Sequence, residues 1–147
     1  MASVIRSILA VVAGLVLAMV VMMAFESLNG RVLYPDLGRQ AAGLTDREAI
    51  RALFAAAPVG AFLVVIAGWA VGSFAGGWLA AWIGRRPAHA LLTGGLLTLF
   101  GVANNLMIPP PAWFWIVSLA VLLPAAYAGS RLAPGRSPAQ PSVAPAS

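Results

Sequence analysis

The stretch PVGAFLVVIAGWAVGSFAGGWLAAWI, residues 58–83, contains no charged residue and decides the fold class. A hydrocarbon core about 30 Å thick is crossed by about 20 helical residues that rise about 1.5 Å each. Three further runs pass the same test, and they cover residues 7–25, 88–108 and 112–129. The sequence therefore predicts an all-α integral membrane protein, an antiparallel bundle of four transmembrane helices within residues 1–132.

The composition of the whole chain favours a membrane environment. Of its 147 residues, 61% are hydrophobic and 9% are charged, and the mean hydropathy is +0.92. Such a chain cannot cover a soluble domain with a surface of ordinary polarity. The pI near 11.5 does not indicate nucleic acid binding, because the arginines are scattered singly or in one pair. We expect membrane lipids and membrane-protein subunits as partners, and no nucleic acid.

The first apolar run is interpreted as a retained helix and not as a cleaved signal peptide. Its apolar stretch is longer than a usual signal core, and Met22 stands where a cleavage site near Ala24 would need a small residue. Four retained spans place both termini on the same side of the membrane.

The distribution of arginine predicts the orientation. The side that holds the termini carries the cytoplasmic charges Arg6, Arg85, Arg86 and Arg131, to which Arg136 is added. The opposite side also carries four arginines, all in the loop 27–57, so the bias is five to four. The short second loop with its arginine pair and the uncharged third loop support the same orientation. We expect a multi-pass protein of a bacterial inner membrane with both termini in the cytoplasm.

The extracytoplasmic loop 27–57 contains the pattern of a short amphipathic helix. Thr45 to Glu48 form a capping box, and apolar residues then recur with helical spacing from Ile50 to Ala57. We predict a helix over 46–57. Two interpretations of its apolar face are equally favoured: it covers the outer leaflet or the bundle mouth, or it is a simple lead-in to the second span.

The segment 133–147 is rich in proline and small residues and is predicted to be a disordered cytoplasmic tail.

Small residues repeat every four positions along the second span. The predicted helix-packing residues are Gly68, Gly72, Gly76 and Ala80, with Gly14 in the first span. Such a stripe permits close approach of two backbones, which drives helix association in lipid. The partner helix is either a span of the same chain, with the first span as the natural choice, or a span of another subunit.

Four polar residues form the candidate polar or ligand site: Glu26, Asn29, Asn104 and Asn105. Glu26 follows the first run, and the two amides of the third run come to a similar depth because that span runs in the opposite direction. Ionisable groups at membrane depth are costly and often mark function. The alternative is a boundary carboxylate hydrated by headgroups, with amides that only join helices.

The tryptophans are interpreted first as interfacial anchors. Trp113 and Trp115 belong to the outer interface, and Trp78 and Trp82 belong to the inner one. The alternative is a quinone or lipid pocket between the outer tryptophans and Glu26. Trp69 is expected near the midplane, where it packs against a neighbour or fills a cavity.

The sequence contains no recognisable catalytic or metal-binding arrangement. It has no cysteine, no metalloprotease motif, no phosphate loop and no pair of carboxylates within the spans. The single histidine, His89, is interpreted as an interfacial loop residue, since one histidine is a poor metal site. We expect a non-enzymatic protein without cofactor or metal.

The chain resembles small four-span bacterial inner-membrane proteins that have no assigned activity. The resemblance rests on Glu26 and on Leu33-Tyr34-Pro35, Gly68-Trp69, Gly76-Gly77 and the Pro-Ala-Trp-Phe segment 111–114, and it spans roughly the first 130 residues. It implies the four-span architecture only.

Packing motifs without catalytic ones favour an accessory or structural subunit of a homo- or hetero-oligomeric membrane complex. Two alternatives stay open: a small channel or transporter with a polar site near Glu26 and Asn104, and a lipid- or quinone-binding protein.

Overall fold

The computed structural model describes residues 1–134, and every regular element within them is a helix. Four helical segments are long and apolar enough to cross a membrane: Ser3–Leu33, Val59–Gly84, Pro87–Met107 and Ala112–Leu132. The predicted all-helical class with four candidate membrane spans is thereby confirmed. From residue 135 onward, the predicted tail lies outside the described part of the chain.

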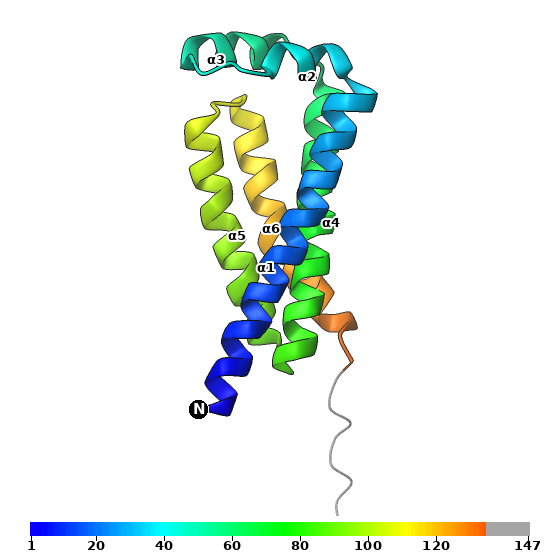
Figure 1. Ribbon diagram of the computed structural model, residues 1–147, viewed down its shortest axis with the longest axis vertical. Coiled ribbons are helices and arrows are strands. Elements are labelled where there is room, and N and C mark those ends of the chain that lie inside the picture. The colour runs from blue at the N-terminus through cyan, green and yellow to red at the C-terminus, as the bar shows by residue number, and fades with distance from the viewer. Residues whose placement is uncertain (135–147) are drawn as a thin grey trace, which may run out of the picture.

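The elements follow one another as α1 (Ala2–Leu28), a π-helical turn η1 (Asn29–Leu33), α2 (Pro35–Ala41), α3 (Arg47–Ala56), α4 (Val59–Gly84), α5 (Pro87–Met107) and α6 (Ala112–Leu132). The four long helices lie side by side, and α2 and α3 lie across one end of them (Figure 1). We call this end the loop end, and the opposite end, which holds the N-terminus, the terminal end. Helix α4 is central, because it packs against α1, α5 and α6.

Local sequence signals fix several helix boundaries. The Asp46 carboxylate accepts a hydrogen bond of 2.8 Å from the Ala49 N–H and so caps α3. Pro87 opens α5 at a position where its missing N–H costs nothing. Between α4 and α5, Arg85 adopts a left-handed conformation with φ 59°, which ends α4 and reverses the chain within a few residues.

The small residues of α4 face α1. A Cβ atom added at Gly76 would collide with the backbone of Gly14, and one added at Gly72 would lie 2.8 Å from the Ala18 carbonyl oxygen. Further toward the loop end, a Cβ atom at Gly68 would meet the side chain of Phe25. The contact therefore runs in opposite directions along the two helices, and glycine is needed where the two backbones touch.

A second contact of small residues, which the sequence analysis did not predict, joins α4 to α6. Gly77 lies against the backbone of Ala126, and Gly129 lies against the carbonyl of Phe74. Beside them, Ser73 is fully buried, and its Oγ donates a hydrogen bond of 2.6 Å to the Leu122 carbonyl oxygen. The two faces of α4 are thus occupied by α1 and α6.

The prediction that His89 is an interfacial loop residue is wrong. His89 lies in the first turn of α5 and is only 7% exposed. Its Nε2 is 3.0 Å from the Ser7 Oγ of α1, and its Nδ1 is 3.2 Å from the Arg86 carbonyl oxygen. Gly84 leaves room for the imidazole ring. His89 therefore joins α5 to α1 through Ser7 and does not lie in an interfacial loop.

Candidate functional site

The helix that contains the first predicted span is longer than that span, and Glu26 lies within the helix. The predicted run ended at residue 25, whereas the candidate span extends to Leu33 through η1. The extension adds roughly 10 Å of helix beyond residue 25. Glu26 therefore lies within the candidate span and not at its end. Its neighbour Phe25 packs on Gly68, which is well inside α4.

The π-helical turn brings Asn29 into the bundle. Asn29 is 8% exposed, and its Nδ2 donates a hydrogen bond of 3.1 Å to the Ala61 carbonyl oxygen of α4. Just beyond it, Gly38 of α2 lies directly against the Gly30 backbone, so the chain can fold back across the loop end. The helix ends after this turn, because Tyr34 is not helical, so η1 is a terminal π-turn.

A cavity of about 200 Å³, which we call the buried cavity, lies under α3. All four residues of the predicted polar site line it: the buried Asn29 and Asn105, and Glu26 and Asn104, which are also exposed at the surface of the bundle. The rings of Phe54, Phe62 and Phe114 form much of the remaining wall, with Phe62 at 5.9 Å from Phe54 and 5.4 Å from Phe114 between ring centroids. Of the described residues, no arginine lines this cavity.

Two amide oxygens at the buried cavity lack a donor. Asn105 is 1% exposed, and its Nδ2 donates to the Ser118 Oγ at 3.3 Å. Within residues 1–134, neither the Asn105 Oδ1 nor the Asn29 Oδ1 receives a hydrogen bond. An unpaired buried acceptor costs about 1–3 kcal/mol, so buried polar groups nearly always have partners. Both oxygens are enclosed by protein atoms, so a partner could reach them only after neighbouring side chains shift.

A second cavity of about 370 Å³ forms a groove between α1 and α5, which we call the α1–α5 groove. Its walls are mainly apolar and include three methionines, and it is lined by Met19, Met22, Met23, Leu97, Phe100 and Gly101. Glu26, Asn104 and Trp69 also line it. Trp69 is 6% exposed and meets Phe114 edge-on, with ring centroids 5.9 Å apart. Trp69, which was predicted to pack against a neighbour or to fill a cavity, thus packs against Phe114 and lines the groove that Glu26 also lines.

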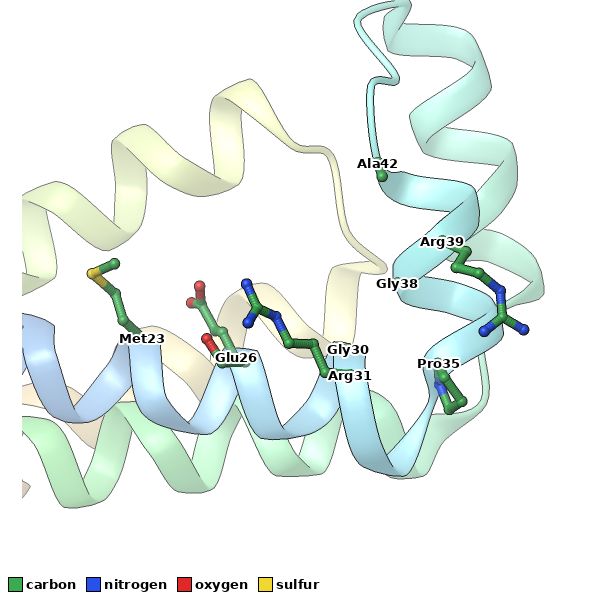
Figure 2. A pocket seen from close by; sticks show the side chains of 9 residues that line it. Met23, Glu26, Gly30, Arg31, Pro35, Gly38, Arg39 and Ala42 are labelled. Carbon is green, nitrogen blue, oxygen red and sulfur yellow. The ribbon is translucent and has the colours of Figure 1, made fainter.

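A third cavity of about 560 Å³ is open at the loop end, and we call it the surface cavity. It is lined by Glu26 and Met23 of α1, by Arg31 of η1, and by Arg39 of α2. Figure 2 shows the Arg31 guanidinium extending back toward Glu26, whereas Arg39 points away. Arg39 forms an ion pair with Asp36, but no carboxylate of the described residues lies within ion-pair distance of Arg31.

Glu26 is the residue that the three cavities share. The buried cavity is rich in oxygen acceptors, the α1–α5 groove is apolar, and the surface cavity carries arginine. The three cavities therefore differ in lining. The groove is mainly apolar, the buried cavity has polar groups at the level of Glu26, and the surface cavity opens at the loop end.

The other predicted residues lie at the two ends of the bundle. Trp113 and Trp115 begin α6 at the loop end, and Trp113 meets Phe62 edge-on at 5.7 Å. Near the end of α4, Trp78 and Trp82 stack on each other, and their ring centroids are 5.7 Å apart. The four arginines Arg6, Arg85, Arg86 and Arg131 are exposed and belong to the helix ends of the terminal end. None of these residues lines a cavity that contains Glu26.

Arg31 and the three methionines were not among the predicted site residues. Met19, Met22 and Met23 looked like ordinary apolar positions of a span. The available signal was spacing, because Met19, Met23 and Glu26 recur at i, i+4 and i+7 and so share one face of a continuous helix. This signal depended on extending the first span past residue 25.

Comparison with protein-family models, with curated proteins and with solved structures finds no match to the chain. The interpretation of the site therefore rests on its own residues.

Proposed function

We propose that this chain is a non-enzymatic membrane protein that binds a phospholipid-like amphiphile at Glu26. The observation that carries the proposal is the meeting of three cavities of different polarity at this one carboxylate. A ligand with an apolar chain and a polar head satisfies all three at once. Pockets that bind small molecules are commonly apolar with a few polar groups that fix the orientation.

The proposal includes a placement in the membrane. The four long helices form an antiparallel bundle in a bacterial inner membrane, with the terminal end in the cytoplasm. The exposed arginines of the terminal end support this orientation. The loop end then faces outward, α3 covers the bundle mouth, and the surface cavity opens at the headgroup level of the outer leaflet.

The walls of the α1–α5 groove fit a hydrocarbon chain. Methionine side chains are flexible and polarisable, so they adapt to chains of different length and unsaturation. The groove has Glu26 and Asn104 at one limit and apolar residues along the helices. An acyl chain lying along Met19, Leu97 and Phe100 would bring its headgroup to the carboxylate.

Assembly as an accessory subunit remains a second proposal. Its support is the long apolar face of α1 that no described residue covers, which includes Ile8, Val12 and Val16. The stripe of α4 supports it less, because α1 of the same chain already lies on that stripe. A subunit partner would therefore pack on α1, where lipid is the alternative neighbour.

Transport through the polar site has weaker support. The buried hydroxyls nearer the middle of the bundle are already engaged: Ser73 donates to Leu122, and Thr93 donates to the His89 carbonyl oxygen at 2.9 Å. They offer no continuation of the polar surface that begins at Glu26.

Native mass spectrometry of protein extracted gently from its own membrane tests the proposal. We expect the 15.1 kDa chain to carry a bound mass in the range of one phospholipid. Met19→Trp, which fills the groove, should abolish this adduct. Val16→Trp, at a position of the same helix that is about as exposed as Met19 but lies outside the groove, should retain it.

The same spectrum separates the competing proposals. A heteromeric complex of defined stoichiometry without a lipid adduct would favour the accessory subunit. A bare chain in both the parent protein and Val16→Trp would contradict lipid binding at this site.

A further inference from the structure

We propose that the Glu26 site selects phospholipids whose headgroup carries a primary ammonium, with the ammonium at Glu26 and the phosphate at Arg31. This inference rests on the proposed lipid binding and specifies the headgroup. The charges, the accessible acceptors and the aromatic walls described above each limit the ligand in a different way.

The buried cavity accepts a cation. Its polar lining consists of the Glu26 carboxylate and three asparagine side chains, and no arginine of the described residues reaches it. The rings of Phe54, Phe62 and Phe114 add aromatic faces, which attract ammonium groups. A carboxylate in a weakly polar setting is costly when alone and is stabilised by a positive partner. The cavity therefore favours an ammonium group over a phosphate or a sugar.

The accessible acceptors Glu26 and Asn104 favour a primary ammonium over a quaternary one. A primary ammonium has three N–H donors, whereas a quaternary ammonium has none. A primary ammonium can therefore donate to the Glu26 carboxylate and to a second acceptor that lines the cavity, such as the Asn104 amide, whereas a quaternary ammonium can donate to neither.

Arg31 supplies the complementary positive charge. It lines the surface cavity together with Glu26, and its guanidinium extends toward Glu26 (Figure 2). It has no ion-pair partner in the described chain, whereas Arg39 is already paired with Asp36. A planar guanidinium binds phosphate oxygens in a two-pronged geometry. A headgroup that carries both an ammonium and a phosphate complements a carboxylate and a guanidinium that line one cavity without forming an ion pair with each other.

Thermal unfolding of the delipidated protein in detergent tests the headgroup preference. The probes are phosphatidylethanolamine, phosphatidylcholine and phosphatidylglycerol with identical acyl chains, so that only the headgroup differs. We expect phosphatidylethanolamine to raise the unfolding temperature most and to bind about tenfold more tightly than phosphatidylcholine, because the latter lacks the N–H donors.

Two pairs of variants locate the preference. Glu26→Gln should remove the preference for phosphatidylethanolamine over phosphatidylglycerol, and Arg31→Gln should weaken the binding of all three lipids. The matched controls Glu48→Gln and Arg51→Gln make the same charge changes at exposed positions of α3 and should behave as the parent protein.

The outcomes separate this inference from the proposal beneath it. Equal stabilisation of the parent protein by all three lipids would overturn the headgroup inference and leave lipid binding intact. Stabilisation by none of them would overturn both. A preference that persists in Glu26→Gln would also overturn the inference, and the comparison of lipids on the parent protein holds even if a variant fails to fold.

Discussion

The contact between α1 and α4 differs sharply between the two ends of the bundle. Near the terminal end, Gly14 and Gly76 bring the two backbones into direct contact, and no side chain separates them. Near the loop end, Phe25 and Met22 stand between the same two helices, and three cavities open around Glu26. One pair of helices therefore combines a closed half with an open half.

The difference suggests that the terminal half of the α1–α4 pair supplies stability and that the loop half holds the site. In lipid, helix association depends on close packing and dispersion, which the glycine contact supplies. Cavities and unpaired buried polar atoms lower the free energy of unfolding, so the loop end contributes less to stability than the terminal end. Stability supplied at the terminal end lets the loop end keep a polar site open.

The largest expected effect comes from filling the closed half. Gly76→Leu forces a side chain into the Gly14 backbone, and overpacking of this kind costs about 1–3 kcal/mol or more. The measurement is the unfolding free energy in mixed micelles. Gly95→Leu is the matched control, because a Cβ atom at Gly95 meets nothing within 4 Å. Equal destabilisation by the two substitutions would contradict the importance of the α1–α4 contact.

A smaller change in unfolding free energy, or an increase, is expected for a substitution in the open half of the bundle. Asn105→Leu removes an unpaired buried oxygen but also the hydrogen bond to Ser118. These effects oppose each other, so the unfolding free energy of the lipid-free protein should stay within about 1 kcal/mol of the parent value or rise. Stabilisation by added phosphatidylethanolamine should decrease. A loss of several kcal/mol without lipid would instead identify Asn105 as a structural residue that holds α5 to α6.

The smallest expected effect concerns the contact between α4 and α6. Ser73→Ala removes the hydrogen bond to the Leu122 carbonyl oxygen, and interhelical hydrogen bonds of this type contribute about 0.6 kcal/mol in membranes. Ser27→Ala, at an exposed position of α1, serves as the control in the same unfolding assay. A decrease above about 2 kcal/mol would show that the hydroxyl does more than join two helices.

Length and polarity made the four spans predictable. The boundaries of the last three agree with the predicted runs to within a few residues, because arginine and proline end them. The helix that contains the first span extends past the predicted run, because Glu26 was treated as a boundary. A single carboxylate does not end a helix, and Asn29 can continue it by donating to a backbone carbonyl of α4.

The candidate site was predictable only in part. The four polar residues could be named because they interrupt apolar sequence, and all four line one cavity. The α1–α5 groove and Arg31 could not be found, since they depend on how far α1 lies from α5 and on the turn η1. His89 was misplaced because it follows the arginine pair closely, although α5 already begins at Pro87.

Fluorescence quenching at Trp69 tests most directly whether an acyl chain occupies the α1–α5 groove. A variant in which Trp78, Trp82, Trp113 and Trp115 are replaced by phenylalanine leaves Trp69 as the only tryptophan, which can be excited selectively at long wavelength. Adding one equivalent of a phospholipid with brominated chains, in detergent, should quench this buried tryptophan, and Met19→Trp in the parent background should compete poorly for the lipid. Undiminished Trp69 emission at saturating brominated lipid, in a variant that unfolds like the parent protein, would contradict the proposed site.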